Sequence, residues 1–382
     1  MKFLHTSDLH LGMRLCEYSL IDDQKYILDR IADIAVSESV DGVIVAGDIY
    51  DKSVPSAEAV SLFDGFLSRL YREGIDVYAI YGNHDSAERI AFGNELVKSS
   101  GIYLSGVFNG SISPIEKEDR FGKINIYLLP FVKPSTVRRF FEDKDINDHN
   151  DAVRACIDTV SLDKESRNII VAHQFVTGAS RCASEEITVG DADNVGHDCF
   201  EDFDYTALGH IHSPQTCHSE YVNYSGTPLK YSLSEANDKK SVTIVELLEK
   251  GKVITKRVPL APLRDMLMIK GSYDEIMRLD YYRGTPLTES YLGICLTDEM
   301  EVPDAMAKLR TVYKYPVKLR YENSRSLLEL GELQAIDQVE KAPDELFAEF
   351  YKLRTGNEMT SEQSDLINEI VSEIWEAENE TN

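Results

Sequence analysis

The sequence lacks the features that mark secreted, membrane-spanning or thiolate-metal proteins. Its six cysteines are scattered and none stands in a CxxC pair, which argues against a disulfide framework and against a structural zinc site built on thiolates. No run of about 18 apolar residues is present, and no signal-peptide hydrophobic region precedes the first predicted strand. We therefore expect a cytoplasmic protein with free thiols and no membrane contact.

Positive charge is also scarce. The chain has 40 Lys and Arg against 66 Asp and Glu, a formal net charge of −26. A chain this acidic is a poor candidate for unaided, non-specific nucleic-acid binding. If nucleic acid is the substrate, bound metal ions or a partner must offset this charge. The length of 382 residues indicates two or three domains.

What the sequence does have is an ordered set of short polar motifs. Each motif follows a predicted buried strand, the place where open α/β sheets position their ligands. The candidate residues are Asp8 and His10, then Asp48 and Asp51 in GDIYD, Asn83 and His84 in GNHD, His173, and finally His210 and His212 in GHIH. Any one of these motifs occurs by chance in many chains, but the ordered set predicts a metal centre.

The residue types in these motifs indicate the chemistry. Carboxylate, amide and imidazole groups suit manganese, iron or zinc, and no thiolate is among them. Two divalent ions about 3.5–4 Å apart form a clamp for in-line attack on a phosphoester. Asp48 is the carboxylate best placed to bridge two ions, and neutral Asn83 limits the negative charge where a phosphate must bind.

The order of predicted elements indicates an α/β fold. Strands at 2–6, 42–46 and 76–80 alternate with helices at 20–39 and 56–72, which is typical of a largely parallel sheet. Strands then become denser and helices fewer. The predicted strands of this second part are 124–129, 168–172, 205–208, 222–224, 241–246 and 252–257. We expect a second sheet packed on the first, giving a four-layer α/β/β/α sandwich over residues 1–258.

The sequence after residue 258 indicates two further parts, which follow a short linker. Residues 259–262 look like a linker, and 263–323 read as a small α/β unit. Its predicted strands are 266–269, 291–296 and 317–321, and its predicted helices are 273–279 and 303–312. The tail, 324–382, is expected to be helical and acidic, with apolar patches that include Phe347, Phe350 and Trp375.

The motifs resemble those of the calcineurin-like metallophosphoesterases. More narrowly, three segments resemble the SbcD family of bacterial double-strand-break nuclease subunits. They are LHTSDLHLG at 4–12, YGNHDSAER at 81–89 and YSGTPLKYS at 224–232. The order of linker, small domain and helical tail is similar as well. The resemblance implies a metallophosphoesterase nuclease domain, a capping domain that positions DNA, and a tail that binds an ATPase partner.

The resemblance also implies a role for each candidate residue. One ion would be held by Asp8, His10, Asp48 and His212, and the other by Asp48, Asn83, His173 and His210. His84 would face the scissile phosphate and stabilise the transition state or protonate the leaving oxygen. Relatives from archaea and eukaryotes carry His where this chain has Asp51. In the wider family an Asp at that place orients the catalytic His, so we expect Asp51 to pair with His84 and to favour its charged form.

For the whole chain, the resemblance implies a manganese-dependent DNA nuclease that acts in repair and recombination. It would be a double-strand exonuclease and a hairpin or single-strand endonuclease. Its partners would be DNA and an SbcC-type ATPase, as a homodimer within a heterotetramer, near the nucleoid. Five basic residues of the capping domain would contact DNA: Lys308, Arg310, Lys314, Lys318 and Arg320.

Several alternatives remain open at this stage. Asp51 could be a loop carboxylate bonded to its own backbone, the basic residues a solvated surface, and the tail patches packing against their own domain. The same metal site could serve a small-molecule phosphodiesterase. The protein could also act mainly as a scaffold that tethers DNA ends.

Overall fold

The computed structural model describes residues 1–180 and 194–323, and within the tail 347–348, 351–352, 358–360, 363–364 and 366–367. These residues form two compact units. One comprises 1–269, 277–294 and 306–319, and the other 270–276, 295–305 and the described part of 320–382. The predicted domain limits at 1–258, 263–323 and 324–382 stay predictions. Most of the predicted helical tail lies outside the described residues, as do Cys182, Phe350 and Trp375.

The first sheet has six strands in the order β16-β15-β1-β4-β5-β6. Neighbours from β1 to β6 are parallel, and β15 is antiparallel to both β1 and β16. The strands are β1 (Lys2–Thr6), β4 (Gly42–Ala46), β5 (Asp76–Ile80), β6 (Ile102–Leu104), β15 (Ser241–Leu247) and β16 (Val253–Pro259). The helices α1 (Ile21–Ser37) and α2 (Ala57–Arg72) pack on it through apolar stripes.

The second sheet also has six strands, in the order β13-β14-β12-β9-β8-β7. Its four central strands are parallel, with an antiparallel strand at each edge. They are β7 (Ile115–Asp119), β8 (Gly122–Leu129), β9 (Arg167–His173), β12 (Tyr205–Gly209), β13 (Gln215–Cys217) and β14 (Ser219–Tyr224). The helices α5 (Pro134–Val137) and α6 (His149–Ile157) and the 3-10 turn η3 (His197–Phe200) contribute buried residues to the core on this side.

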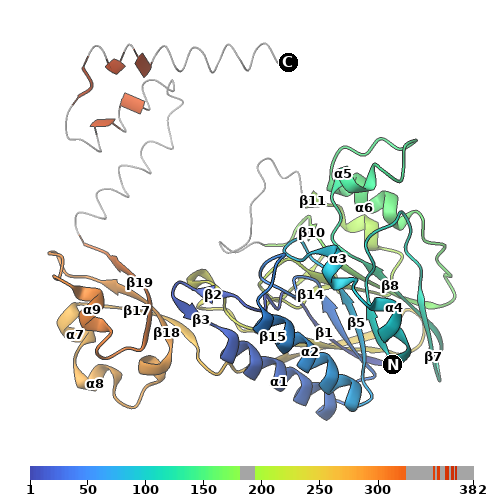
Figure 1. Ribbon diagram of the computed structural model, residues 1–382, viewed down its shortest axis with the longest axis horizontal. Helices are drawn as coiled ribbons and strands as arrows, with labels where there is room; N and C mark the ends of the chain where they lie inside the picture. The colour runs from blue at the N-terminus through green and yellow to red at the C-terminus, as the bar shows by residue number, and fades with distance from the viewer. Residues whose placement is uncertain are drawn as a thin grey trace. The chain divides into compact units, whose positions relative to one another are not determined.

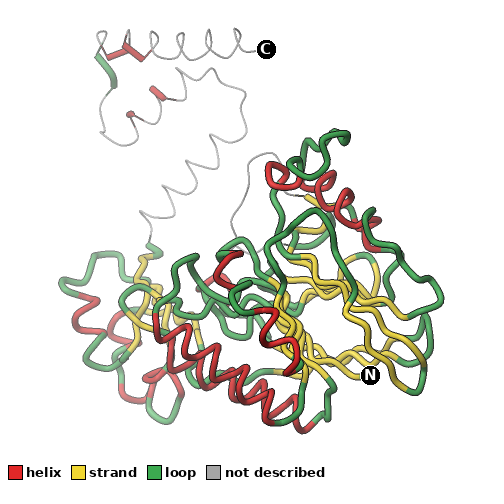
Figure 2. Tube along the Cα trace, turned by 45° about the vertical axis from the view of Figure 1, so that its right-hand side comes forward, coloured by secondary structure: helices red, strands yellow, loops and turns green. Residues whose placement is uncertain are grey.

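Three apolar layers separate these elements, which confirms the predicted four-layer α/β/β/α sandwich. The strands predicted at 241–246 and 252–257 were expected in the second sheet, but they are β15 and β16 of the first sheet, because β15 pairs with β1. One layer lies between the first sheet and its helices, one between the two sheets, and one between the second sheet and its helices. In β4, Val43 and Val45 face the helices whereas Ile44 and Ala46 face the other sheet, since strand side chains alternate. Figure 1 shows α1 and α2 on one side of the strands and α5 and α6 on the other, and Figure 2 shows the strands gathered between the helices.

Short elements complete the first part of the chain. They are β2 (Arg14–Leu15), β3 (Tyr18–Ser19), α3 (Ala87–Ile90), α4 (Asn94–Val97), η1 (Lys98–Ser100), β10 (Phe175–Val176), β11 (Asn194–Val195) and η4 (Leu233–Glu235). The predicted linker at 259–262 is partly wrong. Pro259 ends β16, an edge strand that tolerates proline, and Leu260 is buried and donates its N–H to the Lys240 carbonyl.

The small α/β unit contains a three-stranded sheet, in the order β17-β18-β19. Its elements are β17 (Met266–Gly271), α7 (Tyr273–Ile276), α8 (Leu279–Tyr282), η5 (Pro286–Glu289), β18 (Tyr291–Leu296), α9 (Ala305–Leu309) and β19 (Tyr315–Tyr321). Both predicted helices are shorter than expected, and the segment 273–279 splits between α7 and α8. No helix in the described part of the chain is long and apolar enough to cross a membrane.

Candidate metal centre

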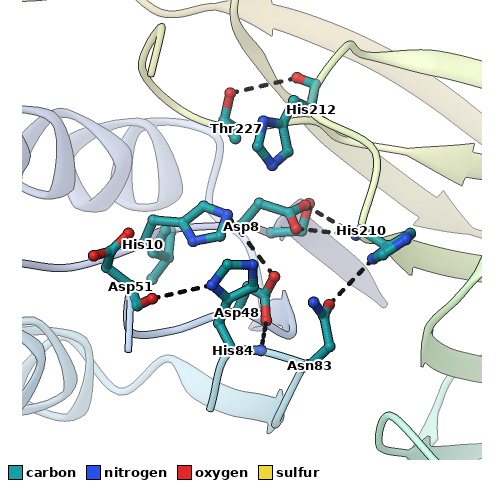
Figure 3. Close-up of polar contacts among 12 residues, drawn as sticks. Asp8, His10, Asp48, Asp51, Asn83, His84, His210, His212 and Thr227 are labelled. Atoms are coloured by element: carbon teal, nitrogen blue, oxygen red, sulfur yellow. Dashed lines mark hydrogen bonds and ion pairs between the residues drawn. The ribbon is translucent and has the colours of Figure 1, made fainter. Parts of the chain in front are cut away.

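The predicted ligands lie together at the carboxyl ends of five strands from both sheets (Figure 3). Asp8 and His10 follow β1, Asp48 follows β4, Asn83 and His84 follow β5, His173 ends β9, and His210 and His212 follow β12. Histidines from different motifs lie close together. The distance between ring centroids is 5.2 Å for His10 and His212 and 5.3 Å for His173 and His210. The two sheets therefore build one site, as the motif order predicts.

The donor atoms of the second predicted ligand set converge. His173 Nε2 lies 3.0 Å from Asn83 Oδ1 and 3.3 Å from Asp48 Oδ2. His210 Nδ1 lies 3.2 Å from the same Asn83 oxygen. These four residues place two imidazoles, one amide oxygen and one carboxylate in one chain of short contacts, a donor set that suits a divalent ion.

Three overlapping groups have donor atoms within 4.8 Å of one another. They are Asp8, His10 and His212; His10, Asp48 and His84; and Asp8, Asp48 and His173. The first group contains three of the four residues predicted for the first ion. Asp8, His10 and Asp48 each occur in two groups, and only Asp48 belongs to both predicted ligand sets. This arrangement suits a bridging role for the Asp48 carboxylate.

An orphaned imidazole supports the fit to a metal. His10 is 3% exposed, and neither of its ring nitrogens has a hydrogen-bond partner among the described residues. Burying polar atoms without partners is costly, so such groups need an explanation. Burial lowers the pKa of His10 to about 3, which keeps the ring in the neutral form that coordinates a metal. A divalent ion beside Asp8 and His212 would satisfy it.

The pKa values of the Asp8 and Asp48 carboxyl groups lie far from their ordinary range. Burial raises the pKa of Asp8 to about 6, although the charge of His173 opposes this shift. Burial acts the same way on Asp48, but the charge of His173 and the hydrogen bond that His173 donates more than offset it and hold the pKa of Asp48 well below its usual range. Strong perturbation of several carboxyl and imidazole groups in one cluster is typical of functional sites.

Backbone strain is concentrated on the same residues. Asp8, His10, Asp48 and His210 all have positive φ, at 52°, 43°, 48° and 97°. Non-glycine residues rarely adopt this conformation, and each instance costs on the order of 1–3 kcal/mol. Because all four of these residues are candidate ligands, the loops that position their side chains are held in conformations that lower the stability of the fold.

Two motif glycines are explained by close approach. A Cβ on Gly209 would lie 1.9 Å from the main-chain oxygen of Ala46, and a Cβ on Gly82 would lie 2.2 Å from Asp48 Oδ1. The strand ends must approach this closely for ligands from both sheets to converge. His173 Nδ1 donates to the same Ala46 oxygen over 2.8 Å, which leaves Nε2 for the metal side.

Asp85 has a structural role that could not be predicted from the sequence. Its carboxylate accepts hydrogen bonds from the main-chain N–H groups of Ile49, Tyr50 and Gly82, at 2.9, 2.8 and 3.0 Å. It thereby ties the loop that carries Asp48 to the loop that carries Asn83 and His84. Its position inside GNHD was the only signal in the sequence.

The contact between His84 and Asp51 is made by the main chain. His84 Nδ1 donates to the Asp51 carbonyl oxygen over 3.0 Å, and the main-chain N–H of His84 donates to Asp48 Oδ1 over 2.9 Å (Figure 3). Burial raises the pKa of the Asp51 carboxyl, and the charges of Lys52 and His84 act in the opposite direction. The two residues are in contact, but through the main chain, so pairing of the Asp51 carboxylate with His84 stays a prediction.

The five basic residues predicted to contact DNA are all exposed. Arg310 pairs with Glu17, Lys314 with Glu289 at 2.5 Å, and Arg320 lies 4.0 Å from Glu322. These pairs are at the surface and contribute little stability. DNA contact at these residues stays a prediction, as does partner binding by the tail, where Phe347 is 40% exposed.

Comparison with known proteins agrees with this geometry. The family model described as calcineurin-like phosphoesterase matches residues 1–214, and the one described as type 5 capsule protein repressor C-terminal domain matches 262–355. The chain is 33% identical to a protein of Staphylococcus saprophyticus named as the SbcD subunit of the nuclease SbcCD, over 98% of this chain and 99% of that protein. A protein of the same name from Staphylococcus epidermidis is 31% identical, over 99% and 100%.

Solved structures that match this chain include a dimetal phosphatase from Danio rerio and the protein TT1561 of Thermus thermophilus. Both are 13% identical to this chain and match 67% of it. The match covers 95% of the Danio rerio chain, with a TM-score of 0.39, and 98% of the Thermus thermophilus chain, with a TM-score of 0.37.

The sequence matches confirm the predicted metallophosphoesterase fold, the resemblance to SbcD, and the prediction of an enzyme that cleaves phosphoesters with divalent metal ions. The chain belongs to the calcineurin-like phosphoesterases and, within them, to the SbcD family of SbcCD nuclease subunits.

Proposed function

We propose that this protein is the nuclease subunit of an SbcCD-type complex and hydrolyses phosphodiester bonds in DNA with two divalent ions. The observation that carries this proposal is the convergence of seven candidate ligands and His84 from five strand ends, in a chain related to SbcD proteins over nearly its whole length. Exonuclease action on duplex ends and endonuclease action on hairpins or single strands belong to the proposal, as does Mn²⁺ as the activating ion.

The two ligand sets follow the predicted division. Asp8, His10, Asp48 and His212 would hold one ion, and Asp48, Asn83, His173 and His210 the other. When bound, the ions polarise the phosphate and make a nucleophile available at neutral pH. The protein's own contribution is to hold the ligands in strained loops and to keep Nε2 of His10 and of His173 free of competing main-chain bonds.

His84 is the residue proposed to act on the substrate. Its ring stands edge-on to His10 with centroids 4.8 Å apart, so it borders the ligand cluster. Donation from Nδ1 to the Asp51 carbonyl fixes the ring and leaves Nε2 as the nitrogen that can meet a phosphate or a leaving oxygen. General acid catalysis of this kind contributes about 10²–10⁴-fold in rate.

The Asp51 carboxylate is proposed to support His84 through its charge. Asp51→Asn keeps the main-chain carbonyl that accepts the His84 hydrogen bond and removes only the charge. We expect the pH profile of kcat to shift in this variant. A profile identical to that of the wild type would limit the role of Asp51 to its backbone.

The proposed partners are DNA and an SbcC-type ATPase, with this chain as a homodimer within a heterotetramer, in the bacterial cytoplasm and at the nucleoid when acting. The names of the two staphylococcal relatives support the ATPase partner. The net charge of −26 supports a complex in which the partner supplies positive charge for DNA. Phe347, Phe350 and Trp375 are the proposed tail contacts.

The test is cleavage of an end-labelled linear duplex by the purified full-length chain, with and without the ATPase partner, in Mn²⁺. We expect cleavage that is abolished by a chelator and reduced about 10²–10⁴-fold by His84→Ala. His197→Ala is the matched control, because His197 is a partly exposed histidine outside the ligand cluster.

Hydrolysis of bis-p-nitrophenyl phosphate without DNA cleavage, even with the partner present, would contradict the proposal and favour a small-molecule phosphodiesterase. Full DNA-end binding combined with full cleavage by His84→Ala would show that His84 has no catalytic part.

A further inference from the structure

One buried carboxylate outside the motif set contacts a candidate ligand. Glu235, in η4, has no exposed surface, and its Oε1 lies 3.4 Å from Nδ1 of His212. Its other oxygen, Oε2, accepts from Lys240 Nζ over 2.6 Å and from the Thr227 hydroxyl over 3.2 Å. Glu235 therefore joins the end of the second sheet to the segment 224–240, which includes YSGTPLKYS.

Lys240 is the counter-charge of Glu235 and is itself 5% exposed. Its ammonium also donates to the main-chain oxygen of His212 over 3.0 Å and to Asp238 over 3.2 Å. The main-chain N–H of Thr227 donates to the same His212 oxygen over 3.0 Å. Both the ring and the backbone of His212 are thus held by one buried ion pair and its neighbours.

The segment 224–240 also reaches the other histidine predicted for the same ion. The Tyr231 hydroxyl donates to the Leu9 carbonyl, and the Tyr231 ring stands edge-on to His10 with centroids 5.6 Å apart. Gln24, from α1, donates to the main-chain oxygen of His10 over 2.7 Å and to the Tyr231 hydroxyl over 3.2 Å. The loop that carries Asp8 and His10 is therefore fixed from the same side.

We propose that Glu235, with Lys240, is a positioning residue that aims Nε2 of His212 at the first metal ion. This inference rests on the proposed two-metal function and deepens it. A carboxylate that accepts from one nitrogen of a metal-ligating histidine fixes its tautomer and orientation, and loss of such a partner costs about 10–100-fold in metal affinity. Lys240 pairs with the carboxylate over 2.6 Å and also donates to the main-chain oxygen of the same histidine.

The geometry indicates that the Glu235–Lys240 pair positions His212 and does not serve only to stabilise the fold. Two buried charges are expensive to desolvate, and replacing such a pair with apolar groups is often neutral for stability. Lys230, in the same segment, forms a second ion pair with Asp265 at 2.8 Å, and within the described part of the chain no contact joins that pair to a candidate ligand. It provides a matched control in the same part of the fold.

The experiment measures Mn²⁺ binding to the full-length chain by calorimetry, after chelation and removal of the chelator. The wild type is expected to bind two ions. In Glu235→Gln, we expect one ion to bind as in the wild type and the other about 10–100-fold more weakly. Lys230→Met should bind both ions with wild-type affinity, even if its unfolding temperature falls.

A second variant controls for a loss of stability in Glu235→Gln, which leaves Lys240 buried without its main partner. Glu235→Gln/Lys240→Met removes both charges, and it should recover the unfolding temperature but not the affinity for the weakened ion. If folded Glu235→Gln and the double variant both bind two ions with wild-type affinity, Glu235 is structural only and the inference is wrong. If the wild type itself binds fewer than two ions, the proposed two-metal function fails instead.

Discussion

Removing the Asp85 carboxylate should loosen the metal centre without touching a ligand. Asp85 satisfies three buried main-chain N–H groups in two loops, from Ile49, Tyr50 and Gly82. Hydrogen bonds to a charged group contribute about 1.5–3 kcal/mol each, and an unsatisfied buried donor costs about 1–3 kcal/mol. Asp85→Asn keeps one acceptor oxygen and turns an N–H₂ group toward at least one of these donors.

For Asp85→Asn we expect a loss of about 3 kcal/mol, with a range of about 2–5 kcal/mol, as two bonds weaken and one donor is left unpaired. At about 2–4 °C per kcal/mol, the unfolding temperature should fall by roughly 6–12 °C. The assay is thermal unfolding in a chelator at about pH 7.5, so that bound metal does not contribute. Because Asp48 and Asn83 lie on the tied loops, Mn²⁺ affinity should fall as well.

The control is Asp158→Asn, which removes an exposed carboxylate paired with Lys144 at 2.8 Å. Exposed pairs of this kind contribute about 0–1 kcal/mol. An Asp85→Asn shift no larger than that of Asp158→Asn would refute the reasoning, because it would mean that the three N–H groups find other partners at no cost.

Four further predictions concern the strand ends, one helix, the buried arginine and the bound metal. Gly209→Ala should lower the unfolding temperature and weaken Mn²⁺ binding, since its Cβ would lie 1.9 Å from the Ala46 oxygen and overpacking costs about 1–3 kcal/mol or more. Gly65→Ala, in α2 with no described atom within 4 Å of the new Cβ, should instead raise stability by about 0.5–1 kcal/mol; a lower unfolding temperature would contradict this. Asp119 pairs with buried Arg167, and although desolvation raises the pKa of Asp119, hydrogen bonds from Arg167 hold it well below the usual range. A depressed folded pKa stabilises the fold above the unfolded pKa of about 3.9, and this contribution is lost as pH falls toward the folded value. Asp119→Asn should therefore be less stable than the wild type in urea unfolding near neutral pH, and the difference should shrink below about pH 4; a difference that is constant with pH would contradict the ionic mechanism. Ligands that bind only the folded state add about 2.7 kcal/mol at a concentration 100 times Kd, so Mn²⁺ should raise the unfolding temperature of the chelated wild type. Asp48→Asn, which alters the candidate bridging ligand, should reduce this rise, and an equal rise in both proteins would argue against a bridging Asp48.

The strands that end at the site could be predicted from the sequence alone. Runs such as 42–46 are apolar throughout because both faces of a central parallel strand are buried, and the observed β4 has those bounds. Parallel strands place their carboxyl ends at one edge, so polar residues just after them could be assigned to one centre before the structure was known. The motif set therefore identified the candidate ligands and His84.

The contacts that support those ligands depend on the tertiary fold. Asp85, Glu235 and Gln24 act through main-chain groups or ligands of other loops, and no periodicity or spacing in the sequence records such contacts. For the same reason the contact between Asp51 and His84 could be expected as a residue pair, but not as a bond to the main-chain carbonyl. The positive φ of the four candidate ligands Asp8, His10, Asp48 and His210 has the same origin. Non-glycine residues rarely adopt this conformation, so their tertiary surroundings must hold these four ligands in it.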